Sequence, residues 1–165
     1  MFCHRANETS TSPYPFITYS NSDFAGCLDT RRSTSGYVVK IGMGAVSWSS
    51  KKQTTVALST TKAEYVASVA AGKEALWMRV LLKELHFEVE NASPMIMDSQ
   101  SALTTVMNPE HHGCMKHLDI SIHWIREVFH RKQIALLYVP TEEMTADILT
   151  NVLEPVKLLV LGMNT

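Results

Sequence analysis

The sequence has no hydrophobic run that approaches the roughly 18 consecutive apolar residues of a membrane-spanning helix. Its first residues, Met-Phe-Cys-His-Arg-Ala-Asn-Glu, also lack the apolar core of a signal peptide. We therefore expect a protein that works without a membrane.

Cysteine is scarce as well. The chain has three cysteines, Cys3, Cys27 and Cys114, which are too few and too odd in number for a disulfide framework. Because disulfides are rare in reducing compartments, an intracellular location, cytoplasmic or nuclear, is expected.

The chain also has little excess of charge of either sign. The formal net charge is −1, without the strong basic excess that is typical of a nucleic-acid binder. Basic pairs do occur at residues 31–32, 51–52 and 131–132. Their simplest interpretation is solvated surface, but local patches of this kind can hold a phosphate backbone. Net charge therefore does not exclude nucleic acid as a partner.

What remains is the composition of a globular protein, since 45% of the 165 residues are apolar. A chain of this length forms one domain with a substantial core. The polar residues 1–15 are expected to be poorly ordered. We assign residues 16–152 to the folded domain and residues 153–165 to a C-terminal tail.

Hydrophobic periodicity predicts an α/β fold in the order βββ-α-β-α-α-β-α. The first three strands should form an antiparallel meander. The long helix over residues 61–85, capped by Thr60 or Thr61, is a crossover, so the next strand should run parallel to an earlier one. Trp48 and Trp77 are expected as core or interface aromatics. The predicted strands cover residues 16–21, 36–41, 45–49, 95–97 and 134–139, and the shorter helices begin near residues 101, 119 and 141.

Asp98 ends the short apolar strand 95–97 and comes just before a helix that Ser99 can cap. Open α/β sheets place their chemistry at such strand ends. An isolated aspartate at this place most often only helps to cap the helix. Two other carboxylates change this interpretation.

Glu64 is the one charged residue on the packing face of the long helix. At 100° per residue it shares a stripe with small and apolar residues. A carboxylate on such a face needs a partner, because an unpaired buried charge is costly. The other members of the stripe are Ala67, Ala71, Ala75, Met78, Leu82 and Leu85.

Asp147 lies in a predicted helix that Thr141 can cap, next to the apolar positions Met144, Ile148, Leu149 and Val152. Glu64, Asp98 and Asp147 thus come from three different elements, each at a strand end or on a packed face. Each alone has a structural explanation. Together they predict a site for a hard cation built from oxygen ligands.

Several motifs, spread in order over residues 16–152, resemble the ribonuclease H domain of copia-type LTR retrotransposon polyproteins. A chance match of this length is implausible. The matching segments are 22–26 (SDFAG), 30–37 (TRRSTSGY), 47–53 (SWSSKKQ), 63–65 (AEY), 73–77 (KEALW), 98–103 (DSQSAL), 116–120 (KHLDI), 138–142 (YVPTE) and 146–148 (ADI).

The resemblance implies an RNase H-like fold, a five-stranded mixed sheet with three antiparallel strands and parallel additions, flanked by helices. The implied activity is endonucleolytic cleavage of RNA in RNA–DNA hybrids with two divalent ions, normally Mg²⁺, with Mn²⁺ as a substitute. The hybrid would be recognised through its shape, 2′-hydroxyls and phosphates. The implied partners are the hybrid and the reverse transcriptase part of the same polyprotein.

By motif, the resemblance places catalytic, metal-binding carboxylates at Glu64, Asp98 and Asp147. The fourth catalytic position falls on Asn21, because the family's first strand reads Tyr-x-Asp-x-Asp and this chain reads Tyr-Ser-Asn-Ser-Asp over residues 19–23. An amide oxygen can coordinate Mg²⁺ but supplies no charge. Asp23 matches the family's second aspartate and is predicted to share a face with Asn21. Weakened activity is therefore expected.

Two further departures from the family pattern are Lys62, where a glutamate is usual, and Asn151, where a lysine is usual. They are typical of a decayed or repurposed copy. The alternative function is a catalytically silent RNase H-like module that binds nucleic acid or a protein.

His111, His112, Cys114 and His117 have spacing reminiscent of a zinc site. A structural zinc site commonly takes its four ligands from two separated pairs, and no second cluster is present. A loop, or a contact at the edge of the substrate, is the favoured interpretation.

Overall fold

The computed structural model of the chain describes residues 14–107 and 116–151. The predicted segment 1–15 and tail 153–165 fall almost entirely outside these ranges and stay predictions. The same holds for His111, His112 and Cys114, and only the backbone of His117 is described. Within the described ranges, no helix is long and apolar enough to cross a lipid bilayer.

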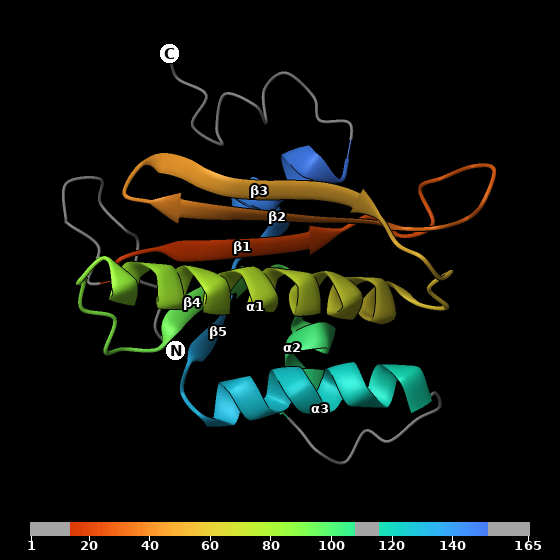
Figure 1. The fold of residues 1–165 in the computed structure, drawn as a ribbon. Coiled ribbons are helices and arrows are strands. Elements are labelled where there is room, and N and C mark those ends of the chain that lie inside the picture. The colour runs from red at the N-terminus through yellow and green to blue at the C-terminus, as the bar shows by residue number, and fades with distance from the viewer. Residues whose placement is uncertain (1–13, 108–115, 152–165) are drawn as a thin grey trace.

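A five-stranded mixed sheet forms the centre of the fold, with the strand order β3-β2-β1-β4-β5 (Figure 1). The first three strands pair antiparallel, whereas β1 pairs parallel with β4 and β4 pairs parallel with β5. The predicted α/β fold and the change from antiparallel to parallel pairing are confirmed. The strands are β1 (Ile17–Ser22), β2 (Thr34–Ile41), β3 (Gly44–Lys52), β4 (Ser93–Met97) and β5 (Ile134–Tyr138).

The helices α1 (Thr60–Glu84), α2 (Gln100–Met107) and α3 (Lys116–His130) pack against one face of the sheet, and α1 is the crossover from β3 to β4 (Figure 1). The alanine-rich stripe of α1 is buried there, as its period predicts. The prediction is wrong for Leu85, which follows the last helical residue and is 56% exposed. The cap is Ser59, whose hydroxyl accepts a hydrogen bond from the Lys62 amide at 3.2 Å.

The other face of the sheet carries a smaller cluster made of Val38, Ile96, Met144 and Ala146. The short 3₁₀ turn η2 (Thr145–Leu149) packs onto it, and a second 3₁₀ turn, η1 (Thr141–Glu143), precedes it without burying a residue. The predicted α-helix capped by Thr141 is therefore wrong. Pro140 occupies the cap position without a side-chain hydrogen bond, and Met144 is extended between the turns, which prevents continuous helical hydrogen bonding.

Other differences are local. The helix α3 begins at Lys116 rather than at Asp119. Trp48 and Trp77 are not core residues, since they are 63% and 54% exposed. Trp48 lies on β3, which has a neighbouring strand on one side only, and Trp77 lies off the buried stripe of α1.

Candidate active site

The carboxyl ends of β1 and β4 lie side by side because the two strands run parallel. Thr18 pairs with Met95 and Tyr19 pairs with Ile96. Asn21 comes two residues after Tyr19 in β1, and Asp98 comes two residues after Ile96 and directly after β4, so both lie at this end of the sheet. This agrees with the position that the sequence predicts for Asp98, near the end of the first strand.

Glu64 reaches the same place from the first turns of α1. Its Oε1 accepts a hydrogen bond from the Ser22 amide at 3.0 Å, at the end of β1. The residue is 7% exposed, and its buried Oε2 has no hydrogen-bond partner. A buried carboxylate oxygen without a partner is costly, and a cation is one group that would satisfy it.

The pKa of Glu64 reports what surrounds its carboxyl group. This pKa is raised to about 8, and burial is the largest cause. The negative charges of Asp98, Asp147 and Asp23 also act to raise it, while the hydrogen bond from the Ser22 amide acts to lower it. Glu64 therefore shares one electrostatic environment with Asp98 and Asp147. Without a cation, it carries a proton for most of the time at neutral pH.

Asp147 is 3% exposed and lies in the turn η2, facing β1. Its Oδ1 accepts a hydrogen bond from Asn21 Nδ2 at 2.8 Å, and Asn151 Nδ2 donates to the same oxygen. Asn21 Nδ2 also donates to Thr150 Oγ1 at 2.9 Å. Asn21 and Asp147 are thus direct partners, although they are 126 positions apart in the sequence.

Asp98 is half-buried and follows β4 directly. Its Oδ2 accepts a hydrogen bond from Thr141 Oγ1 at 3.0 Å. The cap of α2 is Ser99, whose hydroxyl accepts a hydrogen bond from the Ala102 amide at 3.2 Å. Capping of this helix is therefore provided by Ser99 and does not explain the aspartate at position 98.

Asp23 lies beyond the last residue of β1, so the strand alternation that predicted a shared face with Asn21 does not apply to it. Its Oδ1 accepts a hydrogen bond from the Thr34 amide, and its Oδ2 lies close against Gly26. A side chain at Gly26 would put a Cβ 2.2 Å from that oxygen. The Asp23 carboxylate therefore anchors the loop between β1 and β2.

Gln53 also belongs to this site, although no sequence pattern predicts a role for it, and it is 6% exposed. Its Nε2 donates to Ser35 Oγ at 2.9 Å and to the Ala63 carbonyl at 3.0 Å, with a longer contact to Ser22 Oγ at 3.3 Å. This side chain ties β1 and β2 to the start of α1 beside Glu64. In the sequence, Gln53 is marked only as the last residue of the matching segment 47–53.

The structure thus brings the four predicted positions Asn21, Glu64, Asp98 and Asp147 to one end of the sheet. Within the part of the chain that it describes, no three His, Cys, Asp or Glu side chains already form a ligand set around one point. The chemistry of the donors nevertheless fits a hard cation, because all are oxygens and one of them, Glu64 Oε2, lacks any other partner.

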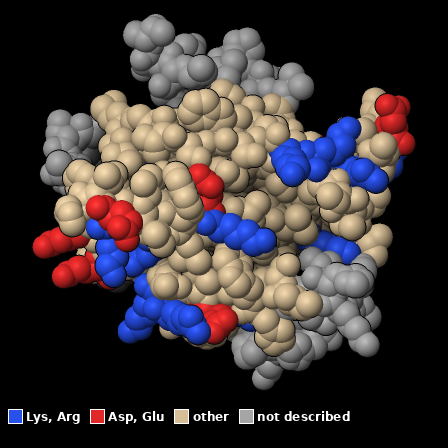
Figure 2. Space-filling view, in the orientation of Figure 1, with Lys and Arg blue, Asp and Glu red and all other residues tan. Residues whose placement is uncertain are grey.

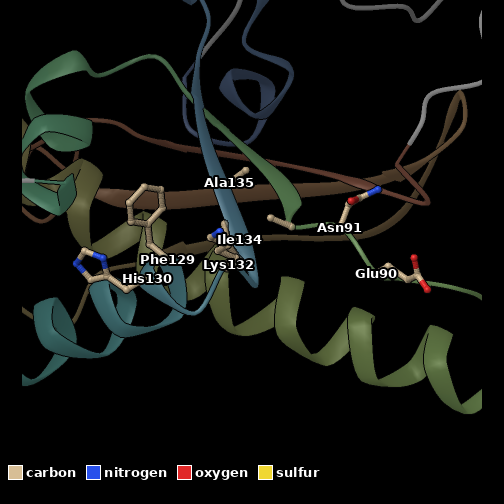
Figure 3. A pocket seen from close by; sticks show the side chains of 8 residues that line it. Glu90, Asn91, Phe129, His130, Lys132, Ile134 and Ala135 are labelled. Carbon is tan, nitrogen blue, oxygen red and sulfur yellow. The ribbon is translucent and has the colours of Figure 1, made fainter.

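A shallow pocket of about 430 Å³ lies at the opposite end of the sheet, where β4 and β5 begin (Figure 3). None of the predicted site residues lines it. Its wall combines the segment before β4, the end of α3, the turn before β5 and the start of β5, and Figure 3 shows these side chains. The lining residues are Glu90, Asn91, Ala92, Phe129, His130, Lys132, Ile134 and Ala135.

The raised pKa of Glu64 predicts how stability depends on pH in the absence of metal. The folded state binds this proton more tightly than the unfolded state, so stability should fall as pH rises from about 5 to about 8. The limiting slope for one proton is about 1.4 kcal/mol per pH unit. Glu64→Gln should remove this contribution. The measurement is denaturant unfolding in a chelator at several pH values.

The control is Glu127→Gln, since the Glu127 side chain is exposed and pairs with Arg131 on α3. This variant should keep the pH dependence of the parent. An equal pH dependence in the parent and in Glu64→Gln would contradict the assignment of the buried proton to Glu64.

Comparison with known protein families finds no family model that matches the chain. Individual relatives do match. The chain is 42% identical over 134 residues to the retrovirus-related Pol polyprotein from transposon TNT 1-94 of Nicotiana tabacum, covering 81% of the chain. It is 36% identical over 138 residues to the corresponding polyprotein from transposon RE2 of Arabidopsis thaliana, covering 84% of the chain. In each case the match spans 10% of the polyprotein.

Solved structures share the fold at low sequence identity. The N-terminal RNase H domain of a Mycobacterium tuberculosis protein superposes with a TM-score of 0.60 at 16% identity, over 82% of this chain and 90% of that one. LC11-RNase H1, in a complex with an RNA/DNA hybrid, superposes with a TM-score of 0.58 at 17% identity, over 82% of this chain and 94% of that one. The resemblance read from the motifs is confirmed: the chain is homologous to part of the Pol polyproteins of copia-type retrotransposons and has the ribonuclease H fold.

Proposed function

We propose that this chain is the ribonuclease H part of a retrotransposon polyprotein, a metal-dependent endonuclease that cleaves RNA in RNA–DNA hybrids and is weakened by Asn21. One observation carries the proposal: Glu64, Asp98 and Asp147, from a helix, a strand end and a turn, meet Asn21 where the parallel strands β1 and β4 end. The proposed place of action is inside the cell, and the proposed larger partner is the reverse transcriptase part of the same polyprotein.

The proposed ligands of Mg²⁺ or Mn²⁺ are Glu64, Asp98 and Asp147. When bound, divalent ions supply Lewis-acid stabilisation of charge on the attacking and leaving oxygens of the phosphate. The chain's own part is to hold the oxygen donors in place. The Ser22 amide fixes Glu64, the Thr141 hydroxyl fixes Asp98, and Gln53 braces the strands beside them.

A basic surface close to this site supports a nucleic-acid substrate. Arg31, Arg32, Lys51 and Lys52 are exposed and lie in the loop after β1 and at the end of β3. Figure 2 shows Lys and Arg side chains gathered at this end of the molecule. Lys51 pairs with Ser35, which in turn pairs with Ser22, so it lies two strands, roughly 10 Å, from the end of β1. Phosphates held here would pass close to the carboxylates.

The hydrogen bond from Asn21 to Asp147 favours a second candidate function. It places a neutral amide at the fourth catalytic position, where the family resemblance implies a carboxylate, and this reduces the capacity of the site for cations. The alternative is therefore a silent RNase H-like module that binds nucleic acid or a protein without cutting.

A cleavage assay separates the two functions. An RNA–DNA hybrid with labelled RNA is incubated with the protein over a titration of Mg²⁺ or Mn²⁺, and binding of the same hybrid is measured at low salt. Metal-dependent cleavage supports the endonuclease. Binding without cleavage supports the silent module, and the absence of both contradicts a nucleic-acid function.

Divalent metal should also stabilise the fold. Without a cation, ionisation of Glu64 beside Asp98 and Asp147 is unfavourable, and an ion that binds only the folded state raises the melting temperature by mass action. At ten times its dissociation constant the gain is about 1.4 kcal/mol, or about 3–6 °C for a domain of this size. Thermal melting with and without millimolar Mg²⁺ or Mn²⁺ measures the shift.

Asp98→Asn should lose most of this shift, whereas Glu90→Gln, an exposed position at the other end of the sheet, should keep it. A melting temperature of the parent that does not respond to either ion would show that the site is not competent to bind metal.

A further inference from the structure

The hydrogen bonds around Asp147 come from two residues that depart from the family pattern. Asn21 and Asn151 both direct their Nδ2 groups to Asp147 Oδ1, and Asn21 also donates to Thr150 Oγ1. These are two of the positions at which the sequence departs from the motifs of the family it resembles, which imply an aspartate and a lysine there. Both substitutions therefore converge on one carboxylate oxygen.

The two amides satisfy Asp147 without any cation. Both donate N–H hydrogen bonds to Asp147 Oδ1, so this oxygen is satisfied although the residue is only 3% exposed. Glu64 differs from Asp147 in this respect, because its Oε2 is buried and has no hydrogen-bond partner. In the candidate site, the carboxylate oxygen of Asp147 is thus satisfied by hydrogen bonds, whereas Glu64 keeps an unsatisfied oxygen.

The count of charges also distinguishes Glu64 and Asp98 from Asp147. Two divalent ions bring four positive charges, against three negative charges on Glu64, Asp98 and Asp147. One divalent ion balances Glu64 and Asp98 alone. The charge that a second ion would need at the end of β1 is missing, because Asn21 is neutral and its amide is committed to Asp147 and Thr150.

We propose that, of the two ions for which the three proposed ligands could serve, this chain binds a single divalent cation, on the side of Glu64 and Asp98. Asn21 and Asn151 bind Asp147 Oδ1 where a second ion would otherwise lie. The proposal rests on the proposed function, since it concerns the same site. It assigns Asn21 and Asn151 as positioning residues that determine the number of ions bound.

The test counts the Mn²⁺ and Mg²⁺ ions bound per chain by isothermal titration calorimetry, on the full chain and without nucleic acid. The parent should bind one ion, and Asn21→Asp should bind two. The matched control is Asn91→Asp, the same change of charge at an exposed position at the other end of the sheet, and it should bind one.

In a chelator, Asn21→Asp should melt at a lower temperature than the parent, because the new carboxylate lies against Asp147. Mn²⁺ should reverse this loss.

A second variant keeps the test decisive if Asn21→Asp folds poorly. Asn151 is exposed, so Asn151→Asp adds a charge beside Asp147 at little risk to the core, and it should also admit a second ion. Two ions in the parent would overturn the single-site proposal and leave the metal-dependent function standing. One ion in the parent and in both variants would overturn the role of the asparagines. No ion in the parent would overturn the metal centre itself, and with it the proposed function.

Discussion

Asp98→Asn is expected to abolish cleavage of an RNA–DNA hybrid while the fold survives. The substitution removes a charge from the proposed metal site, where the loss of a ligand costs several kcal/mol and each ~1.4 kcal/mol is a factor of ten in rate. The fold should tolerate it because an amide oxygen can still accept the hydrogen bond from Thr141 Oγ1. Ser99 continues to cap α2.

The measurement is the initial rate of RNA cleavage, with thermal melting as the check on folding. Because the parent is expected to be slow, the substitution is also made in the Asn21→Asp background, where a loss is easier to detect. Glu90→Gln, a neutralised acid at the distant end of the sheet, should cleave at the parent rate. Cleavage by Asp98→Asn at the parent rate would refute the site assignment.

Asn21→Asp is expected to raise the cleavage rate in Mg²⁺ by at least about tenfold over a parent that cleaves poorly or not at all. The substitution restores a charge at the end of β1, at the same end of the sheet as Asp98 and 2.8 Å from Asp147 in the present hydrogen bond. Added ligand charge strengthens cation binding and stabilises the transition state by several kcal/mol. Asp23 does not already supply this charge, since its carboxylate is bonded to the Thr34 amide and packed against Gly26.

The rates of the parent, Asn21→Asp and Asn91→Asp are compared on the same hybrid over a range of Mg²⁺ concentrations. The control should match the parent because its new charge is far from the candidate site. Equal rates for the parent and Asn21→Asp, both above background, would show that Asn21 does not occupy the catalytic position. Hybrid binding with no cleavage by either protein would favour the silent module.

Much of the architecture follows from the sequence alone. Alternation of apolar residues predicts the early strands, and a long amphipathic helix between strands demands a crossover and parallel pairing. From these rules Asp98 could be placed beside the end of β1, with Glu64 facing it. The stripe of alanines on α1 also predicts the close approach of helix and sheet that buries Glu64. Such patterns are local, so the chain itself carries them.

Tertiary structure decides the remaining features, because they depend on partners far apart in the chain. The last segment has the apolar pattern of a helix, but it forms 3₁₀ turns where it packs on the second face of the sheet. The exposure of Trp48 depends on the edge position of β3. The bond from Asn21 to Asp147 spans 126 positions, and no periodicity predicts it. The sequence supplied the acidic residues, but only the folded chain determines which are satisfied by amides and which, like Glu64, keep an oxygen for a cation.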